Sequence, residues 1–416
     1  MRNSSFSWIL IGLMIIIDMY VFFAIRTLFN IHKYRQIFTI SYWTLSVLSI
    51  VTILLIPNIE FSENQKALRN FLFVSVFSLF FAKLLAALFF LIDDLRRVVQ
   101  WIFQKFFVTE KIARDEISTE LNVTRSAFLT WLGIGVGSTV FSTFIYGLSN
   151  KYNYKIHKHT LKFKNLPLAF DGLKIVQLSD IHSGSFSDKA AVQKGIQKVL
   201  NLKPDIILFT GDLVNNTADE IKPYIDIFSA LKAPMGVFST LGNHDYGDYH
   251  KWNQLSDKAA NLQALKEHHA AMGWRLLNDE NVQLTKDGDK ISIIGVQNIS
   301  GRGSFQTYGN LSTAMQGVDT SFNILMSHDP SHWDKEVNTN YQQIQLTLSG
   351  HTHGMQYGLE IPGFKWSPIQ YIYKQWAGLY QKKEQYLYVN RGFGFLGYPG
   401  RVGILPEITY FELRKN

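Results

Sequence analysis

The chain has 416 residues, 47% of them hydrophobic, a formal net charge of +8 and no cysteine. The length permits one large domain or two ordinary ones. Without cysteine, disulfide bonds and thiolate metal sites are excluded, so any metal must be held by His, Asp, Asn or Glu. Many of the basic residues flank apolar segments, where they act as topology signals or contact anionic lipid headgroups. We therefore do not expect nucleic acid as a partner.

Four long apolar segments lie in the first 150 residues, at positions 6–29, 37–56, 71–92 and 127–148. Each is close to the roughly 20 residues that a helix needs to cross about 30 Å of hydrocarbon. The fourth is richer in Gly, Ser and Thr, so it is the weakest span by hydropathy. The sequence predicts a four-helix transmembrane anchor over residues 1–150 and a soluble domain over residues 151–416, in a multi-pass protein of the inner or plasma membrane.

The basic residues of the loops favour an extracytoplasmic soluble domain. An even number of spans leaves this domain on the same side as the N-terminus. The loop between the second and third spans has only Lys66 and Arg69, whereas the loop between the third and fourth carries Arg96, Arg97, Lys105, Lys111, Arg114 and Arg125. The lysines that follow the fourth span make the numbers of basic residues on the two sides of the membrane nearly equal. The stretch "TRSAFLTWLGIGVG" resembles a twin-arginine export signal with one arginine of the pair, and this tips the expectation toward export.

Two charged residues, Asp18 and Lys83, lie near the middle of the first and third spans. Isolated charges are costly at that depth. The two spans run in the same direction, and each charge lies about a dozen residues after the start of its span, hence at a similar depth. The sequence therefore favours an ion pair inside the bundle, with an ion or lipid-headgroup site as the alternative.

Five short apolar runs of the soluble region end in polar residues: "LKIVQLSDIH", "PDIILFTGDL", "GVFSTLGNHD", "SFNILMSHDP" and "LTLSGHTHG". We read each as a buried strand in an α/β domain, with helices at segments such as "SDKAAVQKGIQKVLNL" and "DKAANLQALKEHHAAMG". Ligand sites of α/β sheets form beyond the carboxyl ends of the strands. The polar residues expected to gather there are Asp180, His182, Asp212, Asn243, His244, Asp245, His328, His351 and His353.

Seven oxygen and nitrogen donors can hold two divalent ions if one carboxylate is shared between them. Two ions about 4 Å apart can clamp a phosphate and lower the pKa of a bridging water. His351 and His353 alone would be equally consistent with ordinary loop residues, so the metal interpretation depends on the whole set. His, Asp and Asn ligands suit manganese, zinc and iron alike.

The ordered set D-x-H, G-D, G-N-H-D, a later His and G-H-T-H resembles the signature of the calcineurin-like metallophosphoesterases, from about residue 161 to residue 414. The resemblance implies a four-layer α/β/β/α fold of two mixed sheets with helices outside. It implies that Asp180, His182 and His353 bind one ion, that Asp212 bridges, and that a second ion is bound by Asn243, His328 and His351. It also implies that His244 contacts the phosphoryl group in catalysis, with Asp245 orienting its ring.

The segments "SDIHSGSF", "GHTHG" followed by Gln, and "YVNRGFGFLGYPGRVGILPEI" resemble the membrane-anchored bacterial branch of that family, with Met355 at a position where glycine is often found. We expect the last segment to place Asn390, Arg391 and Arg401 near the site, where Arg391 either contacts a phosphate oxygen or forms a surface salt bridge at a turn.

Outside the motifs we expect side chains with ordinary roles. We expect His250, His268, His269 and His332 to be solvated or on helix surfaces. The aromatic run "WSPIQYIYKQWAGLY" is read as packing, with Trp366, Tyr371, Tyr373 and Trp376 in the lipid headgroup region as the alternative.

These features predict a dinuclear metal-dependent hydrolase of phosphomonoesters or phosphodiesters. Tethering makes lipid-linked or cell-envelope phosphoesters attractive substrates, and nucleotides stay possible. The competing interpretation is a metal-binding membrane receptor or transport accessory without turnover. His244 favours catalysis, because a binding module has no use for an imidazole that does not bind metal beside the phosphate position.

Overall fold

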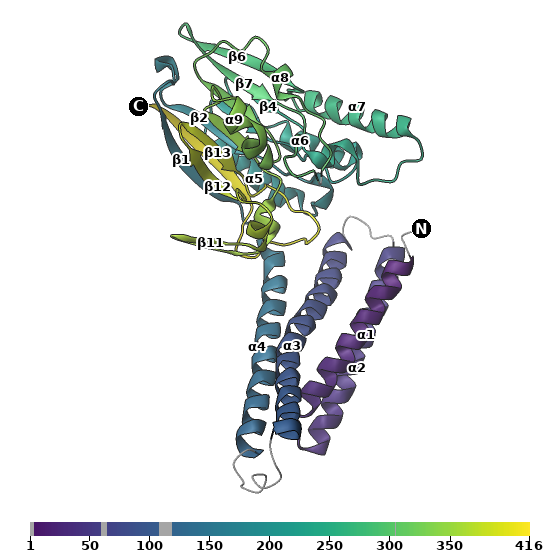
Figure 1. Ribbon diagram of the computed structural model, residues 1–416. Helices are drawn as coiled ribbons and strands as arrows, with labels where there is room; N and C mark the ends of the chain where they lie inside the picture. Colours follow the sequence, from purple (N-terminus) through teal and green to yellow (C-terminus); the bar gives the residue numbers. More distant parts are fainter. Residues whose placement is uncertain (1–3, 60–64, 108–118, 304) are drawn as a thin grey trace. The chain divides into compact units, whose positions relative to one another are not determined.

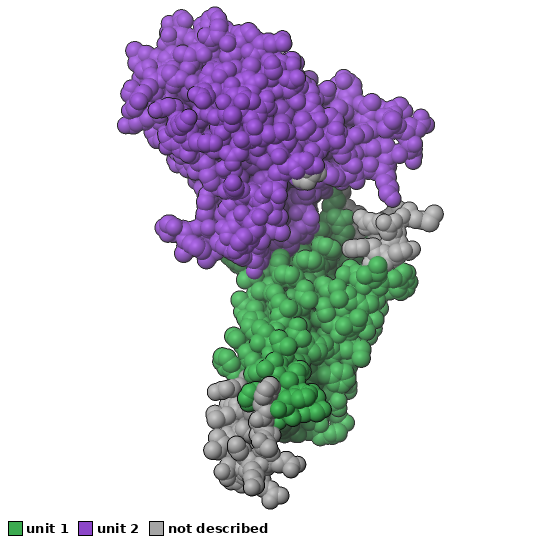
Figure 2. All heavy atoms as spheres, viewed as in Figure 1, with its two compact units in different colours: residues 1–146 green, residues 147–416 purple. Residues whose placement is uncertain are grey.

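A computed structural model describes residues 4–59, 65–107, 119–303 and 305–416 (Figure 1). The chain divides into two compact units, residues 1–146 and 147–416 (Figure 2). In the first unit the described residues form helices joined by short turns, and the second unit contains all the described strands. The boundary lies inside the last helix of the apolar region, so residues 147–150 of that helix belong to the second unit.

Four helices of the apolar region are long and apolar enough to cross a membrane, as the sequence predicted. They are α1 (Ser4–Arg26), α2 (His32–Leu55), α3 (Lys66–Phe107) and α4 (Thr119–Asn150), with the short η1 (Ile56–Asn58) after α2.

Helix α3 is much longer than predicted, because the apolar segment at residues 71–92 is only part of a 42-residue helix. No Gly or Pro interrupts α3. Beyond residue 92 its charges support the helix, since the Asp93 carboxylate pairs with Arg96 at 2.8 Å and Arg97 at 2.9 Å, three and four positions later. A hydropathy boundary is therefore not a helix boundary here.

The predicted ion pair between the first and third spans is confirmed. Lys83 Nζ lies 2.6 Å from Asp18 Oδ1 and donates a second hydrogen bond to Ser46 Oγ of α2 at 3.0 Å. Tyr42, also on α2, donates to the Asp18 carbonyl at 2.9 Å. Both charged side chains are nearly fully buried. The pair and its hydrogen bonds join three helices around one charged centre, as buried charges require.

We predict that removing one partner of this pair destabilises the first unit strongly. Lys83→Met should cost about 3–5 kcal/mol, because Asp18 would be left as an uncompensated buried charge. The exchange Asp18→Lys with Lys83→Asp should recover most of the loss. The measurement is the unfolding of full-length protein in detergent, and equal stability of the single and exchanged variants would contradict the prediction.

The second unit contains two six-stranded mixed sheets and one separate hairpin. The first sheet has the order β1 (Lys155–Phe163), β14 (Glu407–Lys415), β2 (Leu173–Leu178), β3 (Ile206–Phe209), β4 (Val237–Ser239) and β5 (Arg275–Leu276). The second has the order β12 (Gly378–Lys382), β13 (Gln385–Val389), β9 (Leu346–Ser349), β8 (Asn323–Met326), β7 (Asp289–Gly295) and β6 (Glu280–Lys286). The hairpin is β10 (Leu359–Ile361) and β11 (Phe364–Trp366).

The two sheets pack face to face, and each carries a second core on its outer face. Successive residues of one strand point to opposite sides, so Ile175 enters the core between the sheets and Val176 the outer core of the first sheet. Strands buried on both faces account for the continuous apolar runs of the sequence. The result is the four-layer α/β/β/α sandwich that the sequence predicted.

Helices cover the outer face of each sheet. Those beside the first sheet include the two expected from the sequence, α5 (Lys189–Asn201) and α7 (Leu255–Ala271), with η5 (Ala218–Tyr224) and α6 (Ile225–Phe228). The second sheet is covered by short pieces only, α8 (Leu311–Ala314), η7 (Trp333–Val337) and α9 (Asn338–Asn340). The remaining short turns are η3 (Leu168–Phe170), η4 (Ser183–Ser185), η6 (Asn243–Tyr246), η8 (His353–Gln356) and η9 (Pro368–Tyr371).

Two histidines expected at the surface are buried, and for these the sequence interpretation was wrong. His269 packs against Phe209 and Trp274 in the outer core of the first sheet. His332 is buried between Ser327 Oγ, 2.8 Å from Nδ1, and Glu336 Oε2, 3.0 Å from Nε2. An imidazole presents an apolar ring as well as polar nitrogens, so composition alone did not separate these two from surface residues.

Candidate metal centre

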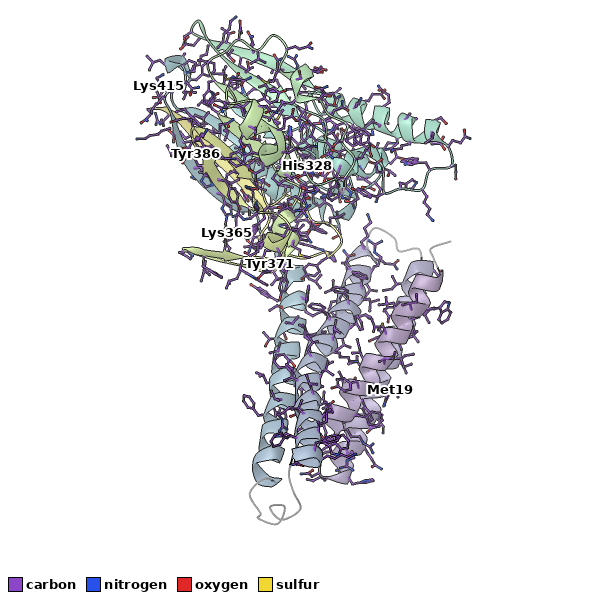
Figure 3. All side chains as sticks on the ribbon, viewed as in Figure 1. Met19, His328, Lys365, Tyr371, Tyr386 and Lys415 are labelled. Carbon is purple, nitrogen blue, oxygen red and sulfur yellow. The ribbon has the colours of Figure 1, made fainter. Side chains whose placement is uncertain are left out.

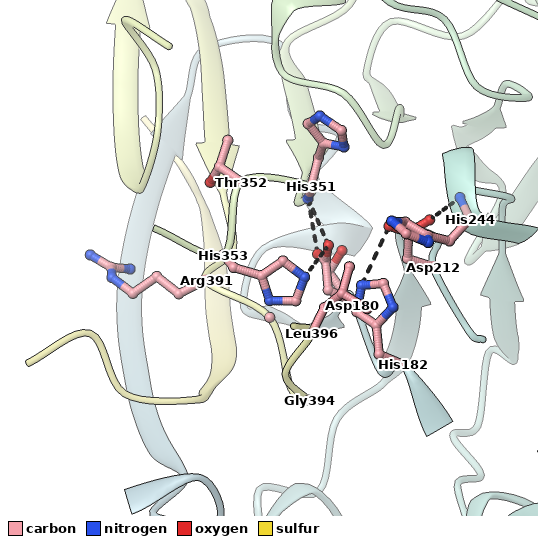
Figure 4. Close-up of polar contacts among 12 residues, drawn as sticks. Asp180, His182, Asp212, His244, His351, Thr352, His353, Arg391, Gly394 and Leu396 are labelled. Atoms are coloured by element: carbon pink, nitrogen blue, oxygen red, sulfur yellow. Dashed lines mark hydrogen bonds and ion pairs between the residues drawn. The ribbon is translucent and has the colours of Figure 1, made fainter. Parts of the chain in front are cut away.

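The polar residues predicted to gather beyond the strand ends do so. Parallel strands β2, β3 and β4 of the first sheet and β8 and β9 of the second each end just before one of these groups. The carboxyl ends of parallel strands meet at one edge, so residues far apart in sequence share one crevice. Figure 4 shows how Asp180, Asp212 and His353 lie toward one another there.

The candidate ligands form two groups. One consists of Asp180, His182 and His353, and the other of Asp212, His328 and His351; in each, the candidate ligand atoms lie within 4.8 Å of one another. Together these groups contain every ligand that the family resemblance implies except Asn243.

Asp212 and Asn243 complete the arrangement. Asp212 Oδ2 lies 3.5 Å from His182 Nε2 and 3.1 Å from His328 Nε2, so this carboxylate faces both groups. The side-chain oxygen of Asn243 lies 2.7 Å from His351 Nδ1. Asn243 is oriented by Tyr249, whose hydroxyl accepts from the amide nitrogen at 2.9 Å. The sequence analysis did not identify Tyr249.

Five of the seven candidate ligands have left-handed backbone conformations. The φ angles are 52° at Asp180, 47° at His182, 60° at Asp212, 72° at His351 and 51° at His353. Such conformations cost of the order of 1–3 kcal/mol each for non-glycine residues and concentrate at functional sites. The sharp turns let side chains one or two positions apart point into the same crevice instead of to opposite faces of a strand.

Hydrogen bonds to one ring nitrogen determine which nitrogen of an imidazole faces the crevice. His328 donates from Nδ1 to the Thr210 carbonyl at 2.8 Å, which leaves Nε2 toward Asp212. His351 is reversed, with Nε2 2.9 Å from the Tyr373 hydroxyl and Nδ1 toward Asn243. Histidines that bind metal commonly hold the second nitrogen in this way.

The charges of the centre fit divalent cations. Burial, with Asp212 nearby, raises the pKa of Asp180 to about 6. Burial alone would lower the pKa of His328, but Asp212 and Asp180 raise it to about 10, so a proton there balances buried negative charge. Both ring nitrogens of His182 and Nε2 of His353 are buried without a hydrogen-bond partner among the described residues. Buried carboxylates beside unpartnered imidazole nitrogens are a donor set suited to manganese, zinc or iron.

His244 lies beside the two groups, but its ring is oriented by a different partner from the one predicted. Its Nδ1 donates to the Asn215 carbonyl at 2.7 Å, and its backbone nitrogen donates to Asp212 Oδ1 at 2.9 Å. Asp245 instead accepts hydrogen bonds from the backbone nitrogens of Gly242, at 2.8 Å, and Asp212, at 2.9 Å. The expectation that Asp245 orients the His244 ring was therefore wrong, because the carboxylate is turned toward the backbone of the turns that carry the candidate ligands.

A pocket of about 350 Å³ opens over the centre. Its walls combine candidate ligands with side chains that the sequence analysis did not identify: Arg302, Phe305, Thr352, Ile369, Ile372, Tyr373 and Leu396. Arg302 and Phe305 follow strand β7, so the rule used for the other five strand ends would have found this loop. The Arg302 guanidinium lies 5.0 Å from the centre of the Tyr373 ring.

The arginines of the C-terminal segment are structural in this arrangement. The Arg391 guanidinium pairs with Glu407 at 2.6 Å and Glu360 at 2.5 Å, and Figure 4 shows it directed away from Asp180 and Asp212. Of the two interpretations, the salt bridge is the one that the structure supports, but the expectation that it lies at the surface was wrong, because Arg391 and Glu407 are buried. Arg401 is fully buried and donates to the carbonyls of Arg391 at 2.8 Å and His353 at 3.2 Å. Asn390 donates to the Thr409 hydroxyl at 2.8 Å.

We predict that Glu407 makes folding sensitive to acid. Burial alone would raise the pKa of this carboxyl, but Arg391 holds it at about 2, below the ordinary value of 4.5. The stabilisation is therefore complete above about pH 4.5 and lost as the pH falls toward 2, and it is of the order of 3 kcal/mol. Glu407→Gln should be less stable than wild type at pH 7 and less dependent on pH between 4.5 and 2.

The measurement is urea unfolding of the full chain in detergent, followed by tryptophan fluorescence. Glu412→Gln is the matched control, because Glu412 pairs with Arg414 at a partly exposed position of the same strand. Equal effects of the two substitutions would contradict the prediction.

Comparisons with known proteins agree with this architecture. Residues 1–151 match the family described as "Probable Calcineurin-like phosphoesterase, transmembrane domain", and residues 173–355 match "Calcineurin-like phosphoesterase". The uncharacterized metallophosphoesterase YkuE of Bacillus subtilis is 33% identical over 263 residues, covering 62% of this chain and 85% of the relative.

Other relatives and one solved structure match over smaller shares. A transmembrane protein with a metallophosphoesterase domain from Danio rerio is 29% identical, covering 65% of this chain and 60% of the relative. The NAD nucleotidase NadN of Haemophilus influenzae is 16% identical, covering 53% of this chain and 45% of that chain, with a TM-score of 0.36. The two consecutive family matches and the extensive alignment with YkuE show that this chain belongs to the calcineurin-like metallophosphoesterases, with a transmembrane domain of the kind that accompanies them.

Proposed function

We propose that this metal-dependent phosphoesterase hydrolyses phosphomonoesters or phosphodiesters at a centre of two divalent ions. In this proposal residues 151–416 form the phosphoesterase domain, and residues 1–150 anchor it with the domain on the extracytoplasmic side. The observation that carries the proposal is the pair of buried Asp/His groups with the Asp212 carboxylate facing both.

Each candidate ligand has a proposed place. Asp212 would be shared by both ions. The first ion would be held by Asp180, His182 and His353, and the second by Asn243, His328 and His351. Two bound divalent ions would supply Lewis-acid charge for a phosphate and a water of lowered pKa. The metals could be manganese, zinc or iron.

His244 is the proposed catalytic residue that does not bind metal. Its Nδ1–H is committed to the Asn215 carbonyl, so Nε2 is the nitrogen left to act on substrate. The ring lines the pocket beside Asn243 and Asp212. From there Nε2 can hold a proton for the leaving oxygen, or donate a hydrogen bond to the charge that develops on phosphorus-bound oxygen. Asp245 contributes indirectly, because it positions the turns that carry Asp212 and His244.

The pocket walls favour a substrate with an apolar part. Phe305, Ile369, Ile372 and Leu396 lie around the polar centre, and Arg302 adds a cation beside them. Together with the membrane anchor, this composition supports lipid-linked or cell-envelope phosphoesters as the substrate class.

We predict that hydrolysis depends on metal and on His244 separately. Chelation of the full-length protein should abolish turnover of aryl phosphodiesters or monoesters, and manganese should restore it. Asp212→Asn should lose both metal and activity. His244→Ala should retain its metal yet lose activity by about 10²–10⁴-fold, the usual contribution of a general acid or base.

His250→Ala is the matched control, because His250 is an exposed histidine of the neighbouring loop. Bound metal without turnover of any phosphoester in the wild type would refute the hydrolase and favour a metal-binding receptor or transport accessory.

We also predict that Tyr373 acts as a positioning residue for the second ion. Tyr373→Phe keeps the ring but removes the hydroxyl that faces His351 Nε2 at 2.9 Å. Loss of such a partner typically weakens metal binding by about 10–100-fold. Metal titration should show one weakened site, with activity recovering at high manganese. Tyr371→Phe, at an exposed tyrosine two residues earlier, should leave the titration unchanged, and equal behaviour of the two variants would contradict the assignment.

A further inference from the structure

The hairpin β10–β11 lies outside both six-stranded sheets and has two chemically different faces. Its register pairs Leu359 with Trp366, Glu360 with Lys365, and Ile361 with Phe364. Directly opposed residues share a face, and successive residues alternate. One face therefore carries Glu360 and Lys365, and the other carries only apolar and aromatic side chains.

The charged face is turned toward the body of the second unit. Glu360 pairs with the buried Arg391 at 2.5 Å, and Lys365 donates to the Ala377 carbonyl and, at 3.3 Å, to the Tyr380 hydroxyl. These contacts leave the apolar face outward, with Leu359 47%, Ile361 51% and Phe364 53% exposed. The orientation is the reverse of a soluble hairpin, which would bury its apolar face and expose its charges.

Neighbouring turns extend this surface. The tryptophan nitrogen of Trp366 lies 3.5 Å from the Tyr371 hydroxyl, which connects the hairpin to η9. Figure 3 shows Lys365 and Tyr371 at the same end of the second unit. We name the surface the apolar rim and define it as Met355, Leu359, Ile361, Phe364, Tyr371 and Ile372. Of eleven large hydrophobic side chains exposed in the described part of this unit, these six lie within 18 residues of sequence. An exposed apolar cluster of this kind marks an interaction surface.

Contacts within the second unit connect the rim to the end of the fourth candidate span. That span is Ala127–Asn150, and its last turn belongs to this unit. The backbone nitrogen of Arg401 donates to the Gly147 carbonyl at 2.9 Å. The next residue, Val402, accepts from the nitrogen of Gly358 at 2.9 Å and pairs with Tyr357, directly before β10. Residues 401 and 402 therefore connect the start of the hairpin to the end of a candidate membrane-spanning helix.

We infer that the apolar rim rests in the interfacial region of the bilayer that holds α1–α4. The lipid surface is the partner expected for this rim, because the contacts of residues 401 and 402 connect the hairpin to the end of α4. Trp366 and Tyr371 suit the level of the headgroups, because each joins an apolar ring to a polar N–H or O–H group, and Phe364 adds a wholly apolar ring to the lipid-buried side of the surface. Of the four aromatic residues considered from sequence for this role, Tyr373 and Trp376 are buried and excluded, whereas Tyr371 and the half-buried Trp366 are retained.

The rim also borders the pocket over the candidate metal centre. Ile372 belongs to both, and Ile369 and Tyr373 on either side of it line the pocket. This step rests on the proposed function. Given that function, the substrate is an amphiphilic phosphoester that reaches the centre from the lipid surface while its acyl or polyprenyl part stays in the membrane.

The location is tested by single-cysteine labelling, for which this cysteine-free chain needs no prior substitution. Full-length Ile361→Cys and Phe364→Cys, labelled with a fluorophore, are reconstituted in phosphatidylethanolamine–phosphatidylglycerol vesicles with brominated acyl chains. We expect quenching severalfold stronger than for Leu255→Cys, an 86%-exposed leucine in α7. Quenching at 361 and 364 no stronger than at 255 would overturn the inference.

The substrate class is tested by the double variant Ile361→Asp, Phe364→Asp. Turnover of a phospholipid-type phosphoester in vesicles should fall at least tenfold, while turnover of a soluble aryl phosphoester stays unchanged. Leu168→Asp, at a 75%-exposed leucine outside the rim, is the control. An equal loss on both substrates would refute lipid-side access. Wild type without turnover of either would refute the proposed function, while the labelling result would still decide where the rim lies.

Discussion

The buried carboxylate of Asp212 is the group on which the arrangement of the second unit depends. It faces imidazoles of both candidate metal groups, and it accepts a hydrogen bond from the backbone of His244. A carboxylate at this depth is unfavourable without a cation, and Asp180 adds a second one nearby. The left-handed turns at both residues add backbone strain. Two sheets buried on both faces provide the rigidity that keeps such turns in place.

Elsewhere in the chain, too, each of these buried charges lies beside an opposite charge. In the first unit, Lys83 compensates Asp18 and further hydrogen bonds come from α2. In the second, Arg391 compensates Glu407 and Glu360. Each pair joins segments that are distant in sequence, so breaking one partner leaves a charge without its counterion instead of merely removing a contact. The buried polar groups therefore specify how helices and strands meet, while the apolar cores supply the bulk of the favourable burial.

The Arg391–Glu360 pair connects this constraint to the surface of the domain. Because Glu360 is drawn inward, its hairpin neighbours Leu359 and Ile361 must point outward. Alternation along a strand leaves no other choice once one face is committed. An interior ion pair thus determines which face of the hairpin is apolar, and through Ile372 that surface adjoins the pocket over the candidate metal centre.

The sequence by itself determined the family, the four apolar helices, the α/β sandwich and the set of residues that gather at the centre. These follow from local patterns: span length, apolar runs that end in polar residues, and motifs whose order along the chain reflects the order of the strands. The pairing of Asp18 with Lys83 could also be predicted, because the rise per residue of a helix converts sequence position into depth in the membrane.

Only the tertiary structure decided what depends on side-chain direction and on contacts between distant segments. It showed that Asp245 caps backbone amides while Asn215 orients His244, that Arg391 is occupied by two carboxylates, and that His269 and His332 are buried. It also brought Tyr373 to His351 and Tyr249 to Asn243. Several of these contacts join segments that are distant in sequence, such as Asp245 with the backbone of Asp212 and Arg391 with Glu360, and no sequence spacing predicts them. Local sequence pattern predicts which residues gather at the carboxyl edge of the sheets. Packing decides which atom of each side chain faces the candidate metal centre.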